Sequence, residues 1–255
     1  MQVCTKHQTP MVRLGSGMEC LACLAEVSAP ARQRAIEFQS AVQAEKVRKR
    51  SREAAIPVGF QQCSFANFDA STPRAQQIAA AMSNYADNFA TQRSIRTGFV
   101  FIGVPGNGKT HMACAMAQAI INRGFSAAYA SLPRFTRELR STYGRRGASD
   151  ALTDRLIEAD FLVLDEIDLH GSSDSDYNLL YDIVNARYES NSRPILAISN
   201  RSLDHLINDL DERVISRILG ATKPIVFDWP SKRGASDWRA AAHHKTENDS
   251  RGARS

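Results

Sequence analysis

Short apolar runs alternate with amphipathic stretches through the middle of the chain. Five apolar runs predict strands, at residues 98–103, 127–130, 161–164, 194–199 and 224–227. Between them apolar residues recur every three or four positions, which predicts helices at residues 111–123, 133–143, 151–159, 177–190, 203–210 and 213–219. Strands that alternate with helices favour a mainly parallel sheet. The predicted fold class is therefore α/β, with a central parallel sheet and helices on both faces.

The segments around this core have a different pattern. Residues 31–54 lack Gly and Pro, and their seven basic and three acidic residues predict an exposed basic helix that ends before Pro57. A further helix is expected from about Thr72, and the polar stretch after Trp238 predicts a disordered tail. We predict four parts, which are a metal-binding module at 1–28, a basic helical linker at 29–58, the α/β core at 59–233 and the tail at 234–255.

Composition and charge narrow the classes of function. The chain has 255 residues, with 32 Lys and Arg against 27 Asp and Glu, a net charge of +5 that permits nucleic acid binding without requiring it. The basic run at 46–52 is either a solvated helix face or a contact to nucleic acid or a partner. No apolar run approaches the roughly 18 residues of a membrane span. We therefore expect a cytoplasmic protein with no membrane partner.

Four residues near the N-terminus have the spacing of a metal site. Cys4, His7, Cys20 and Cys23 form the pattern C-x2-H-x12-C-x2-C. Two close ligand pairs joined by a loop suit tetrahedral Zn²⁺, and three grouped cysteines fit a reduced compartment better than a disulfide framework. The alternative is that the cysteines lie near a histidine by chance. We predict one structural zinc ion, and we expect the two remaining cysteines to be buried thiols.

The sequence GVPGNGKT, at residues 103–110, matches the phosphate-binding loop pattern G-x-x-x-x-G-K-[ST]. A predicted strand precedes it and a predicted helix follows it, as this motif requires. Lys109 is expected to reach the β- and γ-phosphates of ATP, and Thr110 to hold Mg²⁺. The predicted nucleotide-binding residues of this loop are Gly103, Pro105, Gly106, Asn107, Gly108, Lys109, Thr110 and His111.

Two other predicted strands end in polar residues. The sequence FLVLDE ends in Asp165 and Glu166, which suggests one carboxylate near Mg²⁺ and the other near the attacking water. The strand ILAIS is followed by Asn200, whose amide is suited to orienting that water or sensing the γ-phosphate. This arrangement favours hydrolysis over transfer to a second substrate. Taken alone, acids at a strand end are common, and Asn is frequent in turns and helix caps.

Two arginines lie four positions apart in the segment DERVISR. Arg213 and Arg217 therefore share one face of a predicted helix. They either act on the γ-phosphate of a neighbouring subunit or form pairs with acids.

Between residues 60 and 233 the chain resembles the DnaC/DnaI-like replicative helicase loaders and the related IstB-type ATPases, within the AAA+ class of P-loop ATPases. The resemblance rests on GVPGNGKTHMACAMA, LVLDEID, the strand ending in SN, ERVISRI and FDWPSKR. It implies an AAA+ ATPase core with a minimal or absent helical lid. It also implies that Asn200 is the sensor-1 residue, that Arg217 is the trans-acting arginine finger with Arg213 as its competitor, and that Arg233 is a sensor-2-like arginine.

The resemblance also implies a function. We expect an ATP-dependent loader that delivers a hexameric, DnaB-like replicative helicase onto single-stranded DNA, with ATP binding and hydrolysis as the switch. Its expected cofactors are ATP, Mg²⁺ and Zn²⁺, and it is expected to form an ATP-dependent homo-oligomer. The zinc module and linker would dock the helicase, while the core would grip DNA. The alternatives are an IstB-like helper of DNA transposition, or a zinc-containing DNA-binding regulator with a structural nucleotide.

Overall fold

The computed structural model describes residues 2–14, 17–142, 147–168, 174–189 and 193–231. The chain divides into two units, Met1–Lys49 and Arg50–Ser255. Within the described ranges, the helices are all too short or too polar to cross a membrane. The predicted tail and Arg233 lie outside the described residues.

The first unit begins with a small antiparallel hairpin formed by β1 (Val12–Leu14) and β2 (Gly17–Glu19). Helix α1 follows directly and runs from Leu21 to Glu53. It starts ten residues before the predicted position of 31, because it continues through Pro30, a residue type that usually ends or kinks a helix. None of the α1 residues whose side chains the structure describes is buried, as predicted for an exposed basic helix.

The second unit contains a parallel sheet of five strands among the described residues, ordered β4-β5-β6-β3-β7. The strands are β3 (Gly98–Gly103), β4 (Ala127–Ser131), β5 (Phe161–Asp165), β6 (Ile195–Ser199) and β7 (Thr222–Phe227). Each begins and ends within two residues of its predicted position. The predicted parallel α/β architecture is confirmed.

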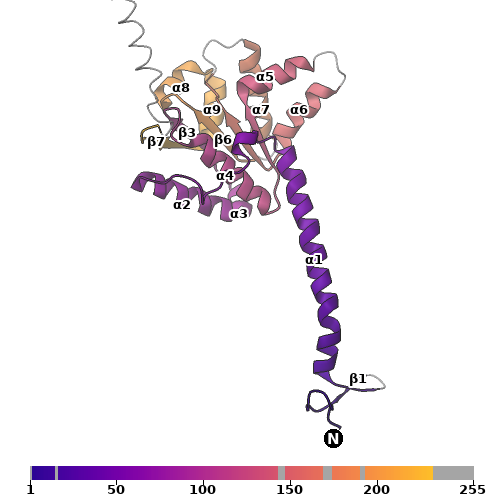
Figure 1. Cartoon of the computed structure of the whole chain (residues 1–255). Helices are drawn as coiled ribbons and strands as arrows, with labels where there is room; N and C mark the ends of the chain where they lie inside the picture. Colours follow the sequence, from indigo (N-terminus) through magenta and orange to yellow (C-terminus); the bar gives the residue numbers. More distant parts are fainter. Residues whose placement is uncertain (1, 15–16, 143–146, 169–173, 190–192, 232–255) are drawn as a thin grey trace, which may run out of the picture. The chain divides into compact units, whose positions relative to one another are not determined.

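Helices cover both faces of this sheet (Figure 1). On one face lie α2 (Pro73–Asp87), α3 (Phe89–Ser94) and α4 (Lys109–Asn122). On the other lie α5 (Leu132–Ser141), α6 (Ala148–Glu158), α7 (Asp174–Glu189), α8 (Leu203–Asp209) and α9 (Glu212–Ala221). A short 3₁₀ helix, Val58–Phe60, precedes α2. As expected, α2 starts after Thr72, whose hydroxyl accepts a hydrogen bond from the Ala75 amide at 3.1 Å.

Successive side chains of β3 lie on opposite faces of the sheet, because side chains alternate along a strand. Val100 and Ile102 belong to the apolar cluster beneath α6, α7 and α9. Phe99 lies on the opposite face, where its ring centre is 4.9 Å from that of Tyr85 of α2. Because both faces are covered, the strand is apolar throughout. This explains why its position could be predicted.

The order of the strands determines where the candidate site lies. Strand β6 lies between β3, which leads into the phosphate loop, and β5, which ends in the two acids. All three strands are parallel, so their carboxyl ends meet at one edge of the sheet. The phosphate loop, the acid pair and Asn200 therefore lie along this edge.

Candidate functional site

The phosphate loop turns sharply between β3 and α4. Gly108 has a φ of 93°, and a Cβ atom there would lie 2.8 Å from Cε2 of Phe68, so glycine is required. Lys109 is buried, and its Nζ donates hydrogen bonds to the Gly103 carbonyl at 2.6 Å and the Val104 carbonyl at 2.9 Å. The ammonium group therefore lies under the backbone that is suited to surround a phosphate.

Asn107 joins this loop to the last strand of the sheet. Its side chain is fully buried, and Nδ2 donates to the Phe227 carbonyl at 2.7 Å. The Trp229 indole N–H donates to the Asn107 carbonyl at 2.9 Å. The Asn107 amide group thus holds the loop in place, which the motif alone did not indicate.

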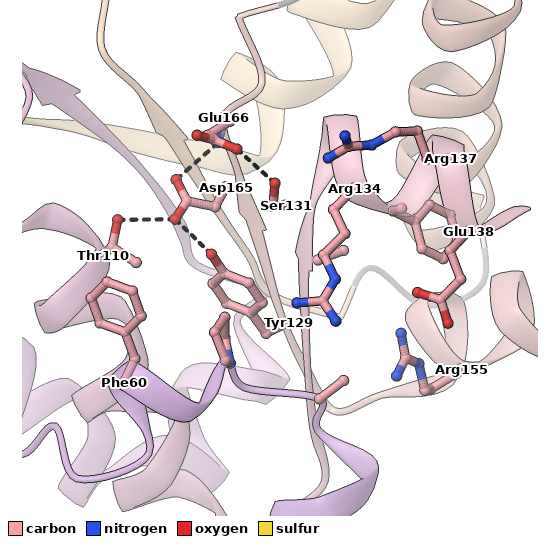
Figure 2. Close-up of a pocket in the computed structure, with 14 residues that line it drawn as sticks. Phe60, Thr110, Tyr129, Ser131, Arg134, Arg137, Glu138, Arg155, Asp165 and Glu166 are labelled. Carbon is pink, nitrogen blue, oxygen red and sulfur yellow. Dashed lines mark hydrogen bonds between the residues drawn. The ribbon is translucent and has the colours of Figure 1, made fainter.

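Asp165 is buried at the centre of a hydrogen-bond network (Figure 2). Its Oδ2 accepts from the Thr110 hydroxyl at 2.9 Å and from the Tyr129 hydroxyl at 2.8 Å, and its Oδ1 accepts from the Glu166 amide at 2.9 Å. Burial raises the pKa of Asp165 above its usual value, and the hydrogen bonds from Tyr129 and Thr110 oppose that shift. Thr110 and Asp165 are therefore placed to share one Mg²⁺ ion, which prefers oxygen ligands.

Glu166 is exposed, unlike Asp165. Its φ is 57°, a left-handed backbone conformation that is uncommon for a residue other than glycine. Its Oε2 accepts a hydrogen bond of 2.6 Å from the hydroxyl of Ser131, the last residue of β4 (Figure 2). The second acid is thus held by a neighbouring strand, separately from the first.

Asn200 lies at the end of β6, where its position is fixed by Asp168. The backbone N–H of Asn200 donates to Oδ2 of Asp168 at 2.8 Å, and the Ser199 hydroxyl donates to Oδ1 of the same carboxylate. Asp168 therefore anchors the turn that carries Asn200. The Asn200 side chain remains exposed.

A cavity of about 220 Å³ lies over the phosphate loop. It is lined by residues 105–111 together with Phe60, Asp165, Glu166 and Asn200. Within this lining, His111 Nε2 lies 3.0 Å from Oδ1 of Asn67, which ties α4 to the segment preceding α2. The structure therefore brings the predicted loop residues other than Gly103, both acids and Asn200 to one cavity.

The two arginines of α9 do not reach this cavity. Arg213 forms an ion pair of 3.0 Å with Asp211, and its guanidinium carbon lies 5.3 Å from the ring centre of Tyr181. The guanidinium carbon of Arg217 lies 4.5 Å from the ring centre of Tyr188, and Arg217 lines a small depression that includes Ile195, the first residue of β6. Strand β6 spans about 13 Å, so Arg217 lies near the sheet edge opposite the phosphate loop.

The predicted zinc ligands lie together in the first unit. The ligand atoms of Cys4, His7, Cys20 and Cys23 all lie within 4.8 Å of one another. The Sγ atoms of Cys4 and Cys23 are 3.8 Å apart, which is about the separation of two sulfurs bound 2.3 Å from a tetrahedral zinc ion. Nδ1 of His7 faces the three sulfurs, and its Nε2 lies 3.0 Å from Oε1 of Glu26.

This His7–Glu26 contact fits a zinc ligand, because ligating histidines usually donate their second ring N–H to a carboxylate. It requires that His7 bind the metal through Nδ1. Cys23 lies in the first turn of α1, so a bound ion would join the segment before the hairpin, which contains Cys4 and His7, to the start of the long helix. The donor set is compatible with zinc, and the two remaining cysteines, Cys63 and Cys114, are buried as expected.

Sequence reasoning missed two residues of the acid network, Tyr129 and Ser131. Both belong to β4, and their pairing with Asp165 and Glu166 follows from the adjacency of β4 and β5. Ser131 carried the same signal as Asn200, since it is a polar residue at the carboxyl end of an apolar strand. Tyr129 carried no such signal, because a tyrosine within a strand is ordinary core composition.

The parallel sheet has a phosphate loop after one strand and an acid pair after another, and a polar residue follows the strand between them. This arrangement defines an ATP-binding core of the AAA+ class. The family described as "IstB-like ATP binding protein" matches residues 37–220. The chain belongs to this family.

Individual relatives agree with this assignment. The chain is 28% identical over 220 residues to the replicative helicase loader DnaC of Escherichia coli K12, covering 86% of this chain and 87% of that protein. It is 30% identical over 181 residues to DnaC of Buchnera aphidicola subsp. Schizaphis graminum, covering 68% and 70%. The crystal structure of the DnaC helicase loader matches with a TM-score of 0.59 at 22% identity, over 66% of this chain and 98% of that one, which supports the fold.

Proposed function

We propose that this chain is an ATP-hydrolysing loader that acts in the cytoplasm and delivers a hexameric, DnaB-like replicative helicase onto single-stranded DNA. The observation that carries the ATPase part is the meeting of Thr110, Asp165, Glu166 and Asn200 at the phosphate loop. The helicase and DNA part rests on the similarity to loaders named for that activity. ATP binding and hydrolysis at this site would be the switch.

The site residues divide the work of hydrolysis, in which ATP and water give ADP, phosphate and a proton. Lys109 would bind the β- and γ-phosphates, with backbone amides of residues 105–108 around them. Mg²⁺ held by Thr110 and Asp165 would neutralise charge on the same phosphates. Glu166 would accept hydrogen bonds from the attacking water, and Asn200 would orient that water.

The position of Arg217 supports a role in trans. It lies near the opposite sheet edge from its own phosphate loop, so it would meet the γ-phosphate of a neighbouring subunit in a head-to-tail assembly. Stacking on Tyr188 would hold its guanidinium group in place. Arg213 is the weaker candidate, because Asp211 already neutralises it. The homo-oligomer would therefore form when ATP is bound.

The first unit is the proposed helicase-docking part. A zinc ion at Cys4, His7, Cys20 and Cys23 would fix the segments on either side of the hairpin. The hairpin exposes Leu14 and Met18, and the helix that follows exposes Phe38. We expect these apolar side chains to contribute to the contact with the helicase. DNA would bind to the ATPase core.

Pull-down experiments with the host's replicative helicase test this assignment. We expect Phe38→Ala to lower helicase capture while ATP-dependent binding of single-stranded DNA is retained. The control is Val58→Ala, which removes an exposed apolar side chain from the second unit. Loss of DNA binding with unchanged helicase capture would reverse the assignment.

The family match also supports a second candidate, an IstB-like helper of transposition. That protein would bind duplex DNA and a transposase. A chain that captures a transposase and ignores the replicative helicase, with and without ATP, would favour this candidate.

A further inference from the structure

A second and larger cavity adjoins the one over the phosphate loop. Its volume is about 440 Å³, and it lies between β4, α5 and α6 and the segment that follows α1 (Figure 2). Both cavities are bounded by Phe60, Thr110, Asp165 and Glu166. The two acids therefore form part of a shared wall between the ATP cavity and this second cavity.

Three arginines line the far side of the second cavity. Arg134 and Arg137 come from α5, and Arg155 comes from α6 (Figure 2). Arg134 and Arg137 are exposed, and Arg155 is half-buried. Glu138 is the carboxylate that faces this end of the cavity, and one carboxylate does not offset three guanidinium groups. An excess of guanidinium groups over carboxylates favours an anionic ligand.

We propose that this second cavity binds the inorganic phosphate that leaves the γ-position after hydrolysis. The proposal rests on the ATPase activity proposed above and names a product site for it. Phosphate is released on the side of the catalytic site where Glu166 lies, while ADP fills the cavity over the phosphate loop. The carboxylates of Asp165 and Glu166 repel this dianion, whereas the arginines attract it.

The wall between the two cavities has polar groups suited to this passage. The hydroxyls of Tyr129 and Ser131 line the second cavity, and each is hydrogen-bonded to one of the acids. If the Glu166 side chain turns away from Ser131, this hydroxyl becomes a donor to the passing phosphate. Movement of one exposed side chain would then connect the ATP site to the arginines.

Thermal unfolding with inorganic phosphate tests the site without relying on turnover. A saturating non-hydrolysable ATP analogue with a methylene bridge fills the γ-phosphate position, so added phosphate can bind only elsewhere. At a phosphate concentration about tenfold above its Kd, and with the ionic strength matched by chloride in the control, we expect the Tm to rise by about 3–5 °C. The double variant Arg134→Ala with Arg155→Ala should lose most of this rise.

Arg140→Ala is the matched control. It removes the same charge from α5, but Arg140 pairs with Asp176 at 2.6 Å and does not line the cavity. This variant should keep the phosphate-dependent rise. Should the double variant fail to fold, the single variant Arg134→Ala serves, because Arg134 is exposed and its loss leaves no buried gap.

Product inhibition gives a second readout. The inhibition constant for phosphate should rise about fivefold or more in the double variant, while KM for ATP stays within about twofold. A wild-type protein that shows no phosphate-dependent rise in Tm, or a double variant that shows the same rise, would overturn the proposal. So would weakened binding of a single-stranded oligonucleotide by the double variant with no effect of phosphate, because the cavity would then belong to the DNA surface. If turnover is absent but the phosphate-dependent rise persists, the anion site stands and the proposed ATPase fails.

Discussion

Replacing Tyr129 by phenylalanine should weaken the site through one hydrogen bond. The Tyr129 hydroxyl donates 2.8 Å to a buried carboxylate oxygen of Asp165, and both residues are buried. A hydrogen bond to a charged group contributes about 1.5–3 kcal/mol, and the Thr110 hydroxyl and Glu166 amide still serve the same carboxylate. We expect the free energy of unfolding to fall by about 1–2 kcal/mol, which lowers the Tm by about 3–6 °C.

The same change should alter how magnesium binding depends on pH. Burial raises the pKa of Asp165, and the Tyr129 hydrogen bond lowers it, so Tyr129→Phe should raise it further. Mg²⁺ needs the ionised carboxylate, and affinity is therefore lost as the pH falls through the folded-state pKa. As the pH is lowered, the Mg²⁺ concentration needed for half-maximal ATP binding should increase. This increase should begin at a higher pH in the variant than in the wild type. Titrations with a fluorescent ATP analogue across a pH series measure this.

Tyr85→Phe is the matched control for this experiment. Tyr85 is equally buried, but its hydroxyl donates 2.6 Å to the neutral Thr97 carbonyl, away from the phosphate loop. It should lose comparable stability and leave the magnesium titration unchanged. Equal magnesium and pH behaviour in the two variants would refute the role given to Tyr129.

Four further outcomes are expected. Lys109→Ala should abolish tight ATP binding, whereas Glu166→Gln should keep binding and lose steady-state turnover, which an equilibrium binding assay and a phosphate-release assay separate. The Arg217→Ala protein by itself should have no ATP turnover, and it should regain part of that turnover when it is mixed with Glu166→Gln subunits, which supply the arginine. Mixed assemblies with no activity would contradict the trans role. Ser131→Ala frees Glu166 from a 2.6 Å hydrogen bond and should raise basal ATP turnover by about fivefold; an unchanged or lower rate in a coupled assay would count against restraint of Glu166 by Ser131. Elemental analysis should find one zinc per chain, and Cys20→Ser should lower that content; fresh protein without zinc would remove the metal prediction.

The strands of the core could be predicted because burial on both faces makes each of them a continuous apolar run. Val100 through Ile102 have no polar interruption, and the chemistry at the carboxyl ends of β3, β5 and β6 follows in the sequence itself. The helix boundary at Leu21 was missed for a physical reason. Pro30 is a residue type that usually ends or kinks a helix, so the local pattern predicts a boundary there. The 33-residue helix nevertheless continues through it.

The contacts that tune the acids could not be predicted. They depend on which strands become neighbours, and that order is set by packing across the whole sheet. Ser131 and Glu166 are 35 residues apart, and Asn107 and Phe227 are 120 apart. Short motifs identify the groups that act, but the residues that hold those groups come from the fold.

The bond between Asn107 and Phe227 also affects the order in which the protein matures on the ribosome. Among the strands that the structure describes, β7 is synthesised last, and its neighbour β3 leads into the phosphate loop. The loop packs so closely on it that a Cβ atom at Gly103 would lie 2.3 Å from the Phe227 carbonyl oxygen. Domains form as synthesis proceeds from the N-terminus, so the proposed zinc module would fold early. The nucleotide site would be completed only after Trp229 has emerged, and an interrupted nascent chain would carry the proposed docking part without the proposed switch.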